Sequence, residues 1–165
     1  MSLPVWAQVS DDRRAHIERV VALLQTWADA MHVEAAERDR WLRAGWLHDA
    51  LRDAPFKDPF AHGPAAADRA AASGEKDRGV LDAVRYHTVG SPDWDDVGAM
   101  LYLADFLEPG RDNDPERERL SRWVPTQRDA VLREVVRRRI DWVLRSGWPL
   151  PEATVAFWNK IAAKP

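Results

Sequence analysis

The sequence predicts an all-α fold, built as one bundle of helices, and three observations support this. Apolar residues recur at spacings of three and four through most of the 165 residues, which places them on one face of a helix. Proline, glycine and aspartate separate the apolar stretches where helices would start and stop. We find neither the alternating pattern of a strand nor an internal repeat. A chain of this length can close a hydrophobic core by itself, so we expect a single domain over residues 1–165.

Caps and helix breakers set the order of the expected helices. Ser10 is a good N-cap, and the two aspartates after it favour the positive end of a helix. Pro64 suits the first turn of a short alanine-rich helix, whereas Pro109 ends the apolar stretch before it. Thr126 is expected to cap a long amphipathic helix that Gly147 closes. The expected helices cover residues 10–31, 33–52, 64–74, 80–90, 97–107, 115–123 and 126–147, with a last one from residue 151.

Composition and charge argue against several classes of function. The net charge of -3 provides no basic stripe for nucleic acid or for an anionic membrane. We interpret the arginines at residues 137–141 as the solvated face of a helix, because apolar residues interleave with them. No apolar stretch has the length of a membrane span, and the first ten residues lack the pattern of a signal peptide. We therefore expect a cytoplasmic protein, monomeric or homodimeric.

Four of the five histidines lie where they can face the core. His16 extends the apolar face of the first helix, and His87 ends the apolar stripe of the fourth. His48 and the aspartate that follows it straddle the inner side of the second helix, and His62 stands just before the third. His32 lies at a helix end with no acidic partner, and we interpret it as structural.

Asp105 is the most informative acidic residue, because it interrupts the apolar stretch of residues 99–107. An ionised carboxylate on a buried face is costly unless a positive charge compensates it. Either one of the many arginines or a divalent metal could supply that charge. Metal sites in helical bundles are built from inward-facing side chains of several helices, so the combination with the histidines favours a metal. The chain has no cysteine, and nitrogen and oxygen donors alone suit iron, manganese or zinc.

Five short motifs, taken together, resemble a known family. They are "RRAHIERV" at residues 13–20, "WLHDALRD" at 46–53, "FAHGPA" at 60–65, "VRYHTVG" at 84–90 and "LYLADFLEPGR" at 101–111. The sequence is similar in them to the HD-domain phosphohydrolases, and among these to the bacterial YqeK-type symmetrical diadenosine tetraphosphate hydrolases. The resemblance covers residues 13–111, and helices within residues 114–165 would complete the HD-domain bundle.

The resemblance implies a two-metal site in which one carboxylate, that of Asp49, bridges the ions. Four residues would hold the shared HD-domain site, and two further histidines would hold the second metal. The six residues are His16, His48, Asp49 and Asp105, then His62 and His87. The subfamily is associated with a di-iron centre, so we expect two iron ions, with manganese as the alternative. A hydroxide that bridges the two metals would split a dinucleoside polyphosphate, diadenosine tetraphosphate, into two ADP.

The resemblance also implies residues that bind the phosphate chain. The expected substrate-binding residues are Arg13, Arg52, Thr88 and Arg111. Arginine is a natural clamp for phosphate because its planar fork donates two parallel hydrogen bonds. Asp49 and Arg52 are the expected catalytic residues, and Glu108 matches a further motif position around the pocket.

Two departures from the family pattern leave alternatives open. The family has lysine where this chain has Arg52, and only twelve residues separate Asp49 from His62, a shorter connection than family members tend to have. The substrate could therefore be another nucleotide or a phosphomonoester, or the chain could be a metal-stabilised nucleotide-binding module without turnover. A plain helical interaction domain without metal is the remaining alternative. Trp94 either stacks an adenine or packs in the core.

Overall fold

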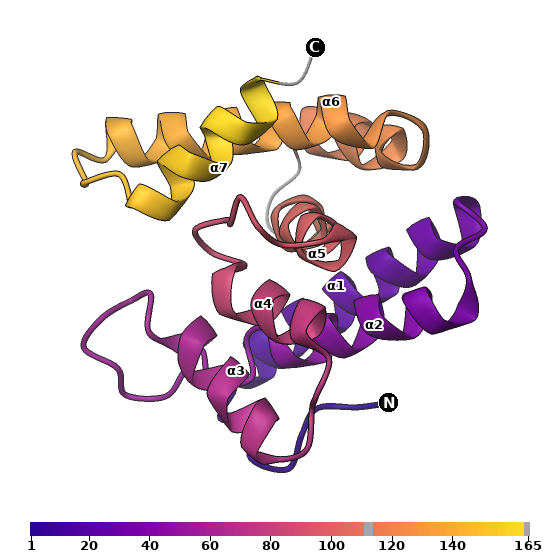
Figure 1. Cartoon of the computed structure of the whole chain (residues 1–165), viewed down its shortest axis with the longest axis vertical. Helices are drawn as coiled ribbons and strands as arrows, with labels where there is room; N and C mark the ends of the chain where they lie inside the picture. Colours follow the sequence, from indigo (N-terminus) through magenta and orange to yellow (C-terminus); the bar gives the residue numbers. More distant parts are fainter. Residues whose placement is uncertain (111–113, 164–165) are drawn as a thin grey trace.

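The computed structural model describes residues 1–110 and 114–163. The described residues form helices joined by turns, with no strand among them, so the predicted all-α fold is confirmed (Figure 1). The helices are α1 (Asp11–Ala30), α2 (Ala35–Leu47), α3 (His62–Ala72), α4 (Arg78–Tyr86), α5 (Asp96–Leu107), α6 (Pro115–Arg145) and α7 (Glu152–Ala162). None of these helices is both long enough and apolar enough to cross a membrane.

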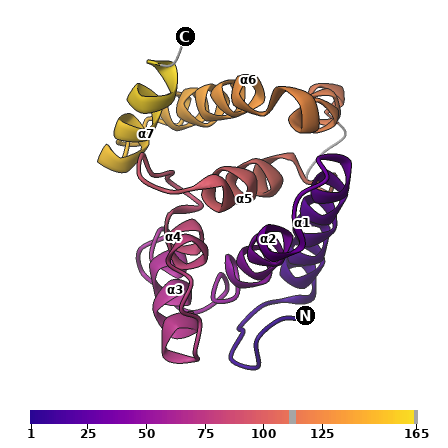
Figure 2. The same cartoon turned by 45° about the vertical axis from the view of Figure 1, so that its right-hand side comes forward.

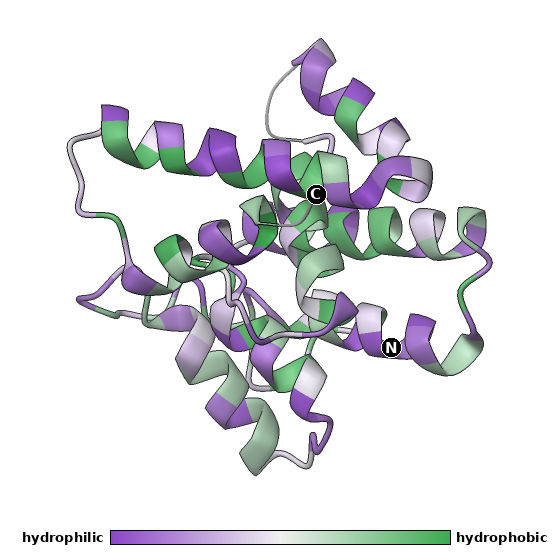
Figure 3. Ribbon diagram, turned by 45° about the horizontal axis from the view of Figure 1, so that its top comes forward, coloured by the Kyte–Doolittle hydropathy of each residue, from purple (hydrophilic) through white to green (hydrophobic). Residues whose placement is uncertain are grey.

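Helix α5 lies at the centre of the bundle. Apart from Asp105, its sequence is apolar on all sides between Val97 and Leu107, which is the pattern of a helix surrounded by protein, and nearly all of its residues are buried. It packs against α1, α2, α4 and α6. Figures 1 and 2 show α6 and α7 together across one end of the molecule, with α5 between them and the other four helices. Figure 3 shows hydrophobic residues concentrated where the helices meet.

Short polar side chains cap the starts of α1, α4, α5 and α6, as capping chemistry requires. The Oγ of Ser10 accepts a hydrogen bond from the backbone N–H of Arg13 at 3.3 Å, which confirms the predicted N-cap of α1. The carboxylates of Asp77 and Asp95 accept backbone hydrogen bonds at the starts of α4 and α5. These caps fix where α1, α4 and α5 begin, and each of these helices supplies a residue to the site described below.

The second helix is shorter than the sequence predicts. We expected it to reach residue 52, but α2 ends at Leu47 and single turns follow. Backbone groups that would continue the helix instead form hydrogen bonds with the N-terminal segment. The N–H of Gln8 donates to the Ala50 carbonyl at 2.7 Å, and the N–H of Asp53 donates to the Gln8 carbonyl at 3.3 Å. The residues after α2 therefore leave the helical path and turn into the interior.

The two helices expected at residues 115–123 and 126–147 run together as α6, with a break at Gln127 (φ -137°, ψ 38°). Pro125 has no N–H, so the carbonyl of Ser121 loses its helical partner, and the Trp27 indole N–H of α1 donates to that carbonyl at 3.0 Å. The hydroxyl of Thr126 donates back to the Trp123 carbonyl at 3.4 Å instead of capping the second half, as we had expected.

Candidate metal centre

The six side chains that the sequence singled out as metal ligands lie together in the interior. They come from five helices and the turn after one of them: His16 on α1, His48 and Asp49 just after α2, His62 at the start of α3, His87 at the end of α4, and Asp105 on α5. All six are buried, with exposed fractions from 0% for His48 to 6% for His16 and Asp105. Because α2 ends before His48, this residue and Asp49 lie on turns and both face the same interior space.

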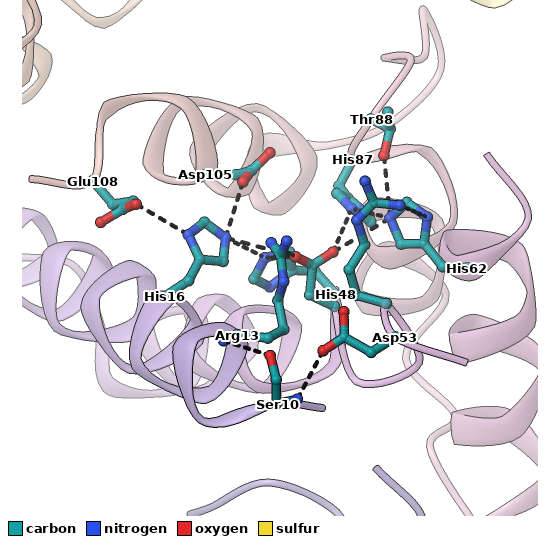
Figure 4. Close-up of polar contacts among 12 residues, drawn as sticks. Ser10, Arg13, His16, His48, Asp53, His62, His87, Thr88, Asp105 and Glu108 are labelled. Carbon is teal, nitrogen blue, oxygen red and sulfur yellow. Dashed lines mark hydrogen bonds and ion pairs between the residues drawn. The ribbon is translucent and has the colours of Figure 1, made fainter. Parts of the chain in front are cut away.

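The first group of atoms gathers around His16. Its Nε2 lies 3.4 Å from the Nε2 of His48 and 3.2 Å from the Oδ1 of Asp105 (Figure 4). The Oδ2 of Asp49 lies 3.7 Å from both histidine nitrogens. Two imidazole nitrogens and oxygens of two carboxylates thus converge on one point.

The second group gathers around the other oxygen of Asp49. Its Oδ1 lies 3.3 Å from the Nε2 of His62 and 3.3 Å from the Nε2 of His87, and these two nitrogens are 3.1 Å apart. The three residues form a set of possible metal ligands whose atoms all lie within 4.8 Å of one another, as His16, His48 and Asp49 do. The carboxylate of Asp49 therefore has one oxygen in each group.

Each of the four histidines is held by its other ring nitrogen. The Nδ1 atoms donate to oxygens that only accept: His16 to Glu108 Oε1 at 3.1 Å, His48 to the Gly45 carbonyl at 2.8 Å, His62 to the Pro59 carbonyl at 3.0 Å and His87 to the Val84 carbonyl at 2.7 Å. A proton on Nδ1 leaves a lone pair on Nε2 in the neutral ring. This is the arrangement that orients histidine ligands of metals, and the donor set suits a divalent transition metal.

The ionisation states also suit a metal. Burial lowers the pKa of His48 to about 4, so its ring is neutral at physiological pH. Burial alone would raise the pKa of Asp49, but its interactions with the surrounding histidines hold that pKa well below its usual range. The Nη1 of Arg13 donates to the Oδ2 of Asp49 at 2.7 Å. Asp49 is therefore an ionised carboxylate beside the neutral ring of His48.

Glu108 orients the His16 ring through a hydrogen bond to its Nδ1. It is 2% exposed, and besides the His16 ring it accepts hydrogen bonds from the Arg19 Nε at 2.6 Å and the Gly110 N–H at 2.7 Å. Burial opposes its ionisation, yet the bonds from His16 and Arg19 lower its pKa to about 2. The sequence did not single out Arg19, although it follows His16 by three residues on α1, close to the same face.

Arg139 was wrongly interpreted as part of a solvated face. Its side chain is only 17% exposed, and its Nη2 donates to the Oδ2 of Asp105 at 2.8 Å. A signal was present in the sequence: Arg139 follows Val135 by four residues and Leu132 by seven, which puts it on the buried stripe of α6. Both compensating charges considered for Asp105, an arginine and a metal, can therefore act at once, one on each oxygen.

Three of the expected substrate-binding residues lie at the edge of the two groups. Arg13 is partly exposed and contacts Asp49. The Nη1 of Arg52 donates to the Pro59 carbonyl at 3.4 Å, and the Oγ1 of Thr88 lies 3.5 Å from the Nε2 of His62. Arg111 lies outside the described residues.

Trp94 is partly buried and packs against the core, as one of its two interpretations predicts. Its ring meets those of Tyr102 and Phe157 edge to face, with centroids 5.8 Å and 5.1 Å away. This is the preferred geometry of buried aromatic side chains.

A helical bundle with two groups of buried His and Asp side chains that share one carboxylate defines the class of the protein. Residues 13–123, more than half of the chain, match the HD domain. The chain belongs to the HD-domain family.

Two curated relatives give the closer comparison, and both are named symmetrical bis(5'-nucleosyl)-tetraphosphatase. The one from Halalkalibacterium halodurans is 28% identical over 88 residues, which cover 53% of this chain and 46% of the relative. The one from Bacillus subtilis is 26% identical over 91 residues, which cover 55% of this chain and 48% of the relative. The chain spans about half the length of the curated relatives it matches.

A crystal structure from Clostridium acetobutylicum shares the fold. It is described as a predicted HD superfamily hydrolase involved in NAD metabolism. Its TM-score to this chain is 0.82 at 20% identity, and the match covers 95% of this chain and 92% of that one. The shared fold thus extends over nearly all of the chain and beyond residue 123, where the match to the HD domain ends.

Proposed function

We propose that this chain is a metal-dependent phosphohydrolase that splits diadenosine tetraphosphate symmetrically into two ADP. One observation carries the proposal: the two oxygens of Asp49 lie in two separate groups of histidine nitrogens, at 3.3 Å and 3.7 Å. A carboxylate so placed can bridge two metal ions. The similarity to two symmetrical tetraphosphatases supports the choice of substrate.

The proposed ligands follow the two groups. His16, His48, Asp49 and Asp105 hold one ion, and Asp49, His62 and His87 hold the other. Two divalent ions in these positions would supply Lewis acidity toward phosphate oxygens and lower the pKa of an attacking water from about 15.7 toward 7. We propose iron for both positions, with manganese as the alternative, because imidazole nitrogens and carboxylate oxygens suit either metal.

The protein's own part in the reaction is to hold donors and charges in fixed directions. Four histidine rings present their Nε2 atoms because the Nδ1 protons are engaged elsewhere. Asp49 stays ionised and joins the groups. Preorganised donors of this kind need no rearrangement when charge develops on the transferred phosphoryl group.

Positive side chains at the rim would bind the phosphate chain. Arg13 reaches Asp49 from a partly exposed position, so its remaining donors can bind phosphate oxygens. Arg52 is exposed and lies beside His62, with 3.5 Å between its Nη1 and the His62 Nδ1. We propose that Arg13, Arg52 and Thr88 bind the substrate, together with Arg111.

The deciding experiment combines metal content with product analysis. Protein purified without oxygen is expected to hold two transition-metal ions per chain by elemental analysis and to convert diadenosine tetraphosphate to ADP alone. Release of ATP and AMP would contradict symmetric cleavage. Fewer than one tightly held ion per chain would contradict the metal site and favour a plain helical interaction domain.

A second candidate function follows from the loop between Asp49 and His62. It holds twelve residues and carries Arg52 in the place of the family's lysine, and both features adjoin the second group. In this second candidate function, the substrate is another nucleotide or a phosphomonoester. Measuring hydrolysis of a panel of such compounds beside diadenosine tetraphosphate separates the two candidates. Ligand binding without turnover of any of them would favour a regulatory module.

A further inference from the structure

We propose that Arg139 is a positioning residue that fixes the two groups of metal ligands relative to each other. This inference rests on the proposed metal site. One guanidinium joins the two groups of ligands. Its Nη2 donates to the Oδ2 of Asp105 at 2.8 Å, and its Nη1 donates to the backbone carbonyl of Thr88 at 3.3 Å. Asp105 belongs to the first group of ligands, and Thr88 directly follows His87 of the second.

The contact with Asp105 sets the rotation of its carboxylate. The Oδ1 lies 3.2 Å from the Nε2 of His16 while Arg139 holds the Oδ2. A planar guanidinium fork fixes direction as well as charge, so Oδ1 faces the first group.

The guanidinium is itself held in place by aromatic rings. It lies over the Tyr102 ring at 4.3 Å and near the Phe106 ring at 5.4 Å from the centroids. Its buried Nε has no hydrogen-bond partner among the described residues. An unsatisfied buried donor costs about 1–3 kcal/mol, so stability alone does not account for an arginine where an apolar side chain could pack on Tyr102.

The C-terminal helices hold the same loop at further points. The hydroxyl of Thr154 on α7 donates to the Val89 carbonyl at 2.7 Å, and Lys160 donates to the Pro92 carbonyl. Phe157 packs so closely that a Cβ on Gly90 would lie 2.3 Å from its ring. The segment after His87 is therefore fixed by α6 and α7, which lie mostly beyond the residues that match the HD domain.

The test is a metal titration of matched variants. Metal-free protein is titrated with Mn²⁺ by calorimetry for the wild type, Arg139→Met, Arg139→Lys and Arg137→Met. Arg137 is exposed and pairs with Glu134 on the same helix, so its substitution controls for the loss of a charge on α6. Circular dichroism and the melting temperature of each metal-free variant report on the fold.

We expect Arg139→Met to bind Mn²⁺ about 10- to 100-fold more weakly, the usual effect of removing a group that orients a ligand. Arg137→Met is expected to bind like the wild type. Arg139→Lys is expected to recover part of the affinity, because an ammonium can pair with Asp105 but cannot also reach Thr88 as a rigid fork does.

The outcomes separate this inference from the proposed function. If the wild type binds no Mn²⁺, the metal site itself is wrong. If the wild type binds and Arg139→Met binds equally well, Arg139 does not position the site. If Arg139→Met does not fold, Arg139→Lys decides, and wild-type affinity in that variant would overturn the proposal.

Discussion

The direction of individual atoms, more than the identity of the residues, is what makes the buried histidines usable as ligands. His48 and His87 each donate Nδ1 to the carbonyl three residues earlier, so a helix end itself orients the ring. Sequence spacing predicts which side chains face inward. It does not predict which ring nitrogen carries the proton, because that depends on acceptors such as the Pro59 carbonyl and Glu108 that fold next to the rings.

Substitution of Arg52 tests whether the side chain at this position, a lysine in the family, acts through its positive charge or by donating a proton. Arginine has a pKa above about 12 and is a poor proton donor, so we expect Arg52→Lys to keep the hydrolysis rate within about threefold at pH 7. Arg52→Gln loses the charged hydrogen bond, worth about 1.5–3 kcal/mol, and is expected to slow the reaction about 10- to 100-fold. Steady-state kinetics, with Lys57→Gln as the control in the same loop, give the comparison. A large gain in rate for Arg52→Lys would instead indicate proton donation.

His32 has a backbone conformation that is unfavourable for a residue with a side chain. It ends α1 with a positive φ of 52°, and its N–H and that of Val33 bond back to Asp29 and Ala28, which is the Schellman arrangement that glycine favours. We expect His32→Gly to raise the free energy of unfolding by about 1 kcal/mol.

Gly74 provides the matched control for that substitution. Its φ is 107° and nothing lies within 4 Å of an added Cβ, so Gly74→Ala tests backbone strain alone and is expected to cost about 1 kcal/mol. Urea titration measures both variants. A destabilised His32→Gly would show that the imidazole makes a contact worth more than the strain.

At the scale of helices, the sequence predicted the elements better than their ends. The buried stripes of α1, α4 and α5 and the cap at Ser10 were predicted from local spacing and chemistry. The end of α2 was not, because residues far along the chain, such as Gln8, take its next hydrogen bonds. The spacing of Arg139 along α6 indicated a buried position, but it could not indicate the partner, because Asp105 lies on another helix.

Arg40 joins the starts of two helices to the side of a third. From α2 its guanidinium contacts Asp77 at 2.8 Å and Asp95 at 2.5 Å, the caps of α4 and α5. We expect Arg40→Met to lower the free energy of unfolding by about 2 kcal/mol, since hydrogen bonds to charged groups contribute about 1.5–3 kcal/mol. Arg38→Met is the control, because Arg38 makes only an exposed pair with Asp29 at 3.4 Å among the described residues and should change stability by less than about 0.5 kcal/mol. Equal effects of the two substitutions in urea titrations would contradict the role of Arg40.

For the whole molecule, the proposed centre would join helices that lie far apart in the sequence. Its ligands come from α1, the turn after α2, α3, the end of α4 and α5. A metal that binds only the folded state adds RT ln(1 + [M]/Kd) to stability, or about 2.7 kcal/mol when the free metal is a hundred times Kd. For a domain of this size each kcal/mol moves the melting temperature by about 2–4 °C.

We therefore expect saturating Mn²⁺ to raise the melting temperature of the metal-free protein by about 5–10 °C. Asp49→Asn removes the carboxylate that reaches both groups, so that variant should show no increase. Asp29→Asn, which changes an exposed carboxylate, should keep the full increase. Thermal unfolding followed by circular dichroism measures all three proteins with and without metal. An increase in Asp49→Asn as large as in the wild type would mean that Mn²⁺ binds elsewhere, and Asp49 would then be a buried acid paired with Arg13 and not the bridge between two ions.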